Sequence, residues 1–194
     1  MRSCFALLLV CTAATPVLSG QWSLSPEVGL TAFGGSGRDS GGLRVGPTRA
    51  SIVAFRLGRE SPQFGFGLRV LTGSSGFGAS DGDLTVIQEH QLRLVEVAGV
   101  ISRQVARVGT SSRLTLEAGP ALDIWSPQGA SSRTRLGAVA GAAWTFPVTP
   151  RLAAAVRLEA VLTPSLFDAA DLPAGAERRV TWRRGVSFAL ARRL

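Results

Sequence analysis

Apolar and polar side chains alternate strictly along four stretches of this sequence, and this alternation restricts the possible folds more than any motif does. From Leu114 to Ile124 the even-numbered positions are apolar, while the odd-numbered positions from Arg113 to Asp123 are polar or very small. Successive side chains of a β-strand point to opposite faces, so the stretch predicts a strand with one apolar face. The other alternating stretches are Trp22–Leu30, Phe64–Leu71 and Leu152–Leu162.

Turn-forming residues divide the chain into eight expected strands: Trp22–Phe33, Thr48–Gly58, Pro62–Thr72, Leu84–Ser102, Arg113–Trp125, Arg133–Phe146, Arg151–Leu162 and Arg178–Ala191. The long connections are expected to be Gly34–Pro47, Gly73–Asp83, Ser126–Ser132 and Thr163–Glu177, and shorter turns lie between them. An even strand number with short turns at one end and longer loops at the other is typical of transmembrane β-barrels. A soluble two-sheet sandwich would explain the alternation equally well, but it needs no such asymmetry.

Three stretches need further interpretation. Residues 152–162 are rich in helix-forming residues, although their period of two favours a strand. In Leu84–Ser102, apolar residues occur on both parities, and a β-bulge near Leu94 and Val95 would bring both sets to the outer face. Arg184 shares the outward parity of its apolar neighbours, where an arginine at mid-bilayer would cost about 2–4 kcal/mol. We therefore expect a second bulge around residues 183–185 that turns Arg184 inward.

The N-terminus resembles an export signal. Arg2 precedes the apolar run Cys4–Ala14, and small residues around Ser19 and Gly20 fit a cleavage site. We expect residues 1–20 to be removed and residues 21–194 to form one barrel domain. An uncleaved membrane anchor is the alternative, but the run is too short to cross a bilayer as a helix. The only cysteines, Cys4 and Cys11, lie in this segment, so the mature chain would have no disulfide. Lipid attachment at Cys11 is a further alternative, although residues 8–10 lack the small residue expected before such a cysteine.

The cations are 21 arginines with no lysine, and the formal net charge is +8. A nucleic-acid-binding protein gathers its cations on one face or tail, whereas these arginines are scattered along the chain. Nucleic acid is therefore not an expected partner.

Charged residues on the inward parities predict an ion-pair network that fills the lumen, because the interior of an eight-stranded barrel is just wide enough for side chains. Arginine forms strong bidentate pairs with carboxylates, so opposite charges on neighbouring strands can pair. Glycines such as Gly67 and Gly119 would leave room for the long arginines. The alternative is a soluble barrel in which these positions face water. The expected network comprises Glu27, Arg56, Arg69, Glu117, Asp123, Arg135, Arg157, Glu159 and Arg183.

Aromatic residues are expected to form two girdles at the membrane boundaries, where amphipathic rings are favoured. The expected members are Trp22, Phe64, Trp144, Phe146 and Phe188 at the periplasmic boundary, and Trp125 and Trp182 at the external one.

Together these features resemble the small outer-membrane β-barrels of the OmpA/OmpX type, over Trp22 to Leu194. The last strand alternates as in that family, through Val186, Phe188 and Leu190, but it ends in Leu194 where the family usually has an aromatic residue. The resemblance implies an all-β, eight-stranded antiparallel up-and-down transmembrane β-barrel in the outer membrane. It further implies a monomer that contacts outer-membrane lipid and depends on the barrel-assembly machinery, with no cofactor and with external loops that bind an unidentified partner.

Two other functions are left open. Some barrels of this size modify lipids with a Ser/His/acid set, and His90 is the only histidine available as a base. It lacks a neighbouring serine pattern, so a structural or interaction role without catalysis is favoured. A secreted soluble barrel that binds an apolar ligand is the third alternative.

Overall fold

The computed structural model describes residues 20–38, 42–80, 85–109, 111–168, 172 and 177–194. Eight strands account for nearly all of them: β1 (Gln21–Arg38), β2 (Arg44–Glu60), β3 (Phe64–Ser80), β4 (Thr85–Val108), β5 (Ser112–Pro127), β6 (Arg133–Pro147), β7 (Leu152–Thr163) and β8 (Glu177–Arg193). In this part of the chain no helix is long and apolar enough to cross a membrane. The predicted signal segment, residues 1–19, lies outside the described residues.

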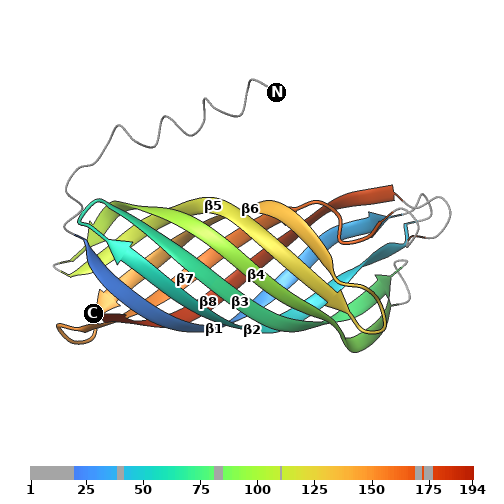
Figure 1. Ribbon diagram of the computed structural model, residues 1–194, viewed down its shortest axis with the longest axis horizontal. Helices are drawn as coiled ribbons and strands as arrows, with labels where there is room; N and C mark the ends of the chain where they lie inside the picture. The colour runs from blue at the N-terminus through green and yellow to red at the C-terminus, as the bar shows by residue number, and fades with distance from the viewer. Residues whose placement is uncertain (1–19, 39–41, 81–84, 110, 169–171, 173–176) are drawn as a thin grey trace, which may run out of the picture.

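Each strand pairs antiparallel with the next, and β8 closes the barrel against β1. The strands are inclined to the long axis of the barrel, as Figure 1 shows. Three short connections, β2–β3, β4–β5 and β6–β7, lie at the end that also holds the C-terminus, and we call this the turn end. The opposite end is called the loop end. The predicted all-β, eight-stranded up-and-down architecture is confirmed.

At the loop end the strands run further than the sequence analysis predicted. Gly37 and Arg38 of β1 pair with Val45 and Arg44 of β2. Residues 73–80 likewise continue β3, although they were expected to form a loop. Glycine and serine carry backbone donors and acceptors like any other residue, so pairing them in the ladder satisfies groups that a loop leaves to water. The first two long loops were thus predicted too long.

The outer surface carries most of the large apolar side chains, and every strand contributes to it. Val28, Leu30, Ile101, Leu136 and Leu158 are each more than half exposed. Along β2 and β3 exposed and buried residues alternate, so that residues such as Val53 and Phe55 point out while Ala54 and Arg56 point in. The period of two in the sequence therefore corresponds to the two faces of the barrel wall.

Neither of the two predicted bulges is present. Leu92, Leu94 and Glu96 pair in unbroken register with β5, and Leu92 and Leu94 are buried inside the barrel. The register of β4 shifts instead against β3 between Gln88 and Leu92, and against β5 between Gln104 and Ala106. β8 is also regular through Arg184, which pairs with Ala32 on β1 and Ala160 on β7.

Candidate functional site: the barrel lumen

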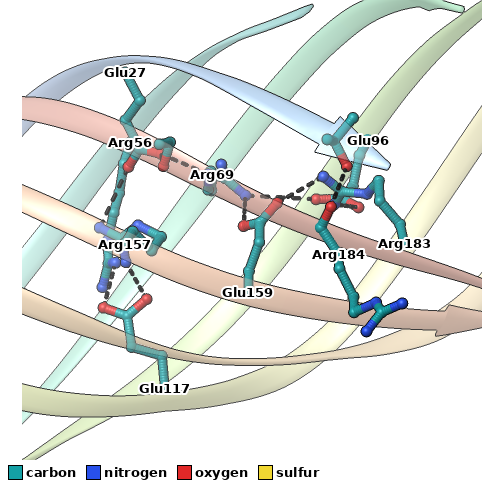
Figure 2. Close-up of polar contacts among 11 residues, drawn as sticks. Glu27, Arg56, Arg69, Glu96, Glu117, Arg157, Glu159, Arg183 and Arg184 are labelled. Atoms are coloured by element: carbon teal, nitrogen blue, oxygen red, sulfur yellow. Dashed lines mark hydrogen bonds and ion pairs between the residues drawn. The ribbon is translucent and has the colours of Figure 1, made fainter. Parts of the chain in front are cut away.

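The middle of the lumen is filled by four arginines and four glutamates that point inward from seven strands. They are Arg56, Arg69, Arg157, Arg183, Glu27, Glu96, Glu117 and Glu159. Each of these side chains is less than a tenth exposed. Figure 2 shows their charged ends converging across the barrel interior.

The ion pairs form one continuous chain. Nearer the turn end, Glu117 pairs with Arg56 at 2.6 Å and also with Arg157. Arg157 then pairs with Glu27 at 3.3 Å. Arg69 continues the chain, because its Nε lies 2.9 Å from the Glu27 carboxylate.

At the other end of this series of ion pairs, two arginines share two carboxylates. Arg69 and Arg183 both pair with Glu159, at 2.5 and 2.6 Å. Arg183 also donates to Glu96, which lies 3.8 Å from Arg69. Most members therefore have two oppositely charged partners.

The network contains equal numbers of arginines and glutamates, so its total charge is zero, although every member is buried. A buried charge is costly unless it is paired and hydrogen-bonded, and removing one partner leaves the other uncompensated. Close packing accompanies the pairing, since a Cβ added at Gly67 would lie 2.9 Å from Arg56 Nε. A cavity of about 40 Å³ is lined by Arg56, Glu117 and Arg157 among others, so little space is left around them.

Toward the loop end the lumen becomes apolar. Its core contains Val45, Ile52, Ala54, Leu71, Leu92, Leu94, Trp125, Leu166 and Phe167. Trp125 is 1% exposed and packs edge-on against Phe33, with ring centroids 5.4 Å apart. Its assignment to the external girdle was therefore wrong: the odd parity of Trp125 on β5 directs it into the barrel.

A short segment after β7 closes the apolar half of the lumen. Leu166 and Phe167 are buried in it, although they lie beyond the last strand residue, Thr163. The Leu166 amide donates to the Thr181 hydroxyl, and Phe167 stacks edge-on against Phe77. We call residues 164–168 the lumen cap.

Arg135 holds the lumen cap rather than joining the central chain of ion pairs. Its Nε donates to the Ser165 carbonyl oxygen at 2.8 Å, and its Nη2 donates to the Asp168 carboxylate at 2.8 Å. The prediction that Arg135 belongs to the lumen network was thus wrong, because its partners are Ser165 and Asp168 of the lumen cap. The segment that supplies these partners comes about 30 residues later in the chain, so the sequence around Arg135 could not predict the contact.

Asp123 and Glu96 also depart from the predicted network. Asp123 is buried beside its cross-strand partner Glu96, but it forms no ion pair within the described part of the chain. Glu96 was missed because the expected bulge in β4 obscured its inward direction. The other seven predicted members point into the barrel and form the ion pairs given above.

The remaining aromatic residues lie mostly where an outer girdle requires them. Trp22, Phe64, Trp144 and Phe188 are all more than two-fifths exposed and lie toward the turn end of their strands. Phe146 is half-buried and contacts Trp144, with ring centroids 5.9 Å apart. Trp182 lies toward the loop end of β8. His90, the candidate base, belongs to β4, but its side chain is outside what the structure describes.

The comparisons with known proteins agree on the fold. No family model matches the sequence, and no curated protein matches it. Among solved structures, neisserial surface protein A is similar with a TM-score of 0.57 and 9% identity, over 89% of this chain and 96% of that one. The outer membrane protein OprG from Pseudomonas aeruginosa gives 0.59 and 6%, over 89% and 95%. A major outer membrane protein from Thermus thermophilus gives 0.50 and 13%, over 89% and 99%. The chain has the fold of the small outer-membrane β-barrels.

Proposed function

We propose that this chain is an integral outer-membrane protein that anchors a closed, non-conducting barrel in lipid, with a structural or interaction role. The observation that carries the proposal is the reversal of the usual distribution of residues: the outer wall is apolar, whereas charged residues are buried inside. Leu30 and Leu136 are 64% and 68% exposed, while Arg69 and Glu96 are 3% and 0% exposed.

Lipid is the medium that makes this arrangement stable. Apolar surface left in water costs about 25 cal/mol per Å², so a wall of exposed leucines, valines and phenylalanines would be strongly unfavourable there. A bilayer removes that cost, and a closed barrel leaves no backbone group of the wall unpaired in hydrocarbon. The three similar outer-membrane proteins support the same location for this chain.

The filled lumen supports an anchor rather than a channel. The ion pairs occupy its middle, and the apolar core with the lumen cap occupies the loop end. Arg38, Arg44, Arg178 and Arg179 are exposed at the loop end, where an external partner would meet the chain. We expect the protein to act as a monomer, to be inserted by the barrel-assembly machinery and to need no cofactor.

An enzymatic role is not part of the proposal. None of the three similar proteins is named for an enzymatic activity. A lipid-modifying role would require His90 to act as a base, and His90→Ala would then abolish turnover of lipid substrates in the refolded protein. A secreted ligand-binding barrel is also disfavoured, because the paired charges occupy the space that an apolar ligand would need.

The experiment that tests the proposal is fractionation in a Gram-negative host. We expect the mature chain to stay in the outer-membrane fraction after carbonate washing and to migrate differently on gels before and after heating. Purified protein in a planar bilayer should give no steady conductance. Recovery of the chain as soluble periplasmic protein would contradict the membrane location, and steady single-channel currents would contradict the closed lumen.

A further inference from the structure

Two arginines on the outer wall, Arg49 on β2 and Arg184 on β8, interrupt its apolar surface, and the outward residues Trp182 and Val180 lie beyond Arg184 toward the loop end. On β8, Arg184 is followed toward the turn end by the outward residues Val186, Phe188 and Leu190. On β2, Arg49 is followed in the same direction by Ser51 and then by Val53. Both arginines are exposed, and neither forms an ion pair within the described part of the chain.

A hollow on the outer wall joins the two arginines. Its volume is about 500 Å³, and Arg49, Arg184, Ala32 and Ser51 are among the residues that line it. Ala32 of β1 pairs with Arg184, and its neighbour Thr31 pairs with Ala50, which follows Arg49 on β2. The small side chain of Ala32 thus lies between two long cationic ones, which leaves the space open.

The guanidinium of Arg184 contacts an aromatic ring and has no hydrogen bond to another side chain among the contacts of the described residues. Its Cζ lies over the Trp182 ring, 4.2 Å from the ring centroid. A stacked guanidinium keeps its N–H donors in the plane of the group, where they can bind phosphate oxygens in pairs. Figure 2 shows Arg184 turned away from the network that its neighbour Arg183 joins.

The outer wall on the turn-end side of the hollow is apolar. Leu30 and Val186 line the turn-end side of the hollow, and Val28 and Phe188 continue the apolar surface toward the turn end. A ligand that fits this surface has an anionic head beside the arginines and hydrocarbon chains against the apolar surface on the turn-end side. A free inorganic anion would make no contact with this apolar surface.

We propose that the hollow between Arg49 and Arg184 binds the phosphate headgroup of a lipid in the leaflet at the loop end, with its acyl chains along β1 and β8. This site rests on the proposed membrane location. It also accounts for an arginine on the outward parity of β8, because a bound phosphate would neutralise a charge that faces lipid, which is otherwise costly.

The test measures lipid binding to the refolded protein in dodecylmaltoside micelles by native mass spectrometry. The probes are phosphatidic acid, phosphatidylcholine and inorganic phosphate. We expect phosphatidic acid to bind in preference to phosphatidylcholine, and Arg49→Gln with Arg184→Gln to weaken that binding at least about tenfold, the factor that 1.4 kcal/mol represents. Ala32→Leu, which keeps both charges but fills the hollow, should also weaken it.

Arg103→Gln is the matched control. Arg103 is exposed on the outer wall toward the turn end and lies over the Phe64 ring at 5.6 Å, but it lines none of the hollows described above. Equal loss of binding in this variant would mean general attraction to a basic surface and would overturn the site. Equal displacement of the lipid by micromolar inorganic phosphate would overturn the assignment to a lipid.

Insertion is read separately, from the heat-dependent gel shift of each variant in vesicles. A protein that inserts normally but shows no preference for phosphatidic acid contradicts the lipid site and leaves the proposed function standing. An unsubstituted protein that fails to insert contradicts both.

Discussion

Replacing Glu117 with alanine should strongly destabilise the barrel. Among the described residues Glu117 is the only carboxylate paired with Arg56, whereas Arg157 keeps its contact with Glu27. The side chain of Arg56 is 7% exposed, so the variant leaves one buried guanidinium without a counter-charge. Breaking a buried pair in this way costs about 3–5 kcal/mol. We expect the lower end, about 3 kcal/mol, because the small cavity beside Arg56 can admit a water molecule.

Urea unfolding of the protein in phospholipid vesicles, followed by tryptophan fluorescence, gives the free energy of unfolding by linear extrapolation. Glu60→Ala is the matched control, because its pair with Arg113 is partly exposed and should contribute less than about 1 kcal/mol. Arg56→Met combined with Glu117→Leu should recover most of the loss, since no unpaired charge then remains at that position. A Glu117→Ala variant within about 0.5 kcal/mol of the wild type, the range of an ordinary surface substitution, would refute the network as a source of stability.

Three further substitutions test the packing of the wall and lumen, the first by the yield of folded protein and the other two by the same unfolding assay. Gly119→Ala should prevent folding, because its Cβ would lie 1.8 Å from the Gly99 carbonyl oxygen. In Gly99→Ala the added Cβ meets no atom within 4 Å, so this control should fold normally. Equal yields of the two folded variants would contradict this packing. Leu158→Arg should cost about 2–4 kcal/mol on a lipid-facing wall, while Val148→Arg in the β6–β7 turn should have little effect. Leu166→Ala should cost about 2–5 kcal/mol if the lumen cap is packed as described, and an unchanged stability would mean that the cap is not part of the core.

Strand number, strand order and the direction of most side chains were accessible from the sequence. A wall one strand thick separates lipid from lumen, so the period of two appears directly in residues such as Leu114 to Ile124. The inward charges Glu27, Arg69 and Glu159 were recognisable for the same reason, because a lipid-facing charge at these positions would be costly. Their individual partners were not accessible, since they depend on the register between distant strands.

The bulge predicted in β4 and the girdle position predicted for Trp125 share one physical cause. We expected the lumen to be polar along its whole length, but its loop-end half is apolar. Leu92 and Leu94 were therefore assigned to the outer face, which required a bulge that is absent and concealed the inward direction of Glu96. Trp125 was placed in a girdle on the same assumption. Hydrophobicity alone cannot distinguish lipid from an apolar interior, whereas the parity of each strand does.

The most direct test of the account is to ask which tryptophans contact lipid. Trp144 is 48% exposed on the outer wall and Trp125 is 1% exposed in the lumen core. Two variants, each retaining only one of them and carrying phenylalanine at the other tryptophan positions, would be refolded into vesicles of brominated phosphatidylcholine. The account predicts strong fluorescence quenching of Trp144 and little quenching of Trp125. Equal quenching of the two, or quenching of Trp125 alone, would contradict the apolar outer wall and closed lumen proposed for this barrel.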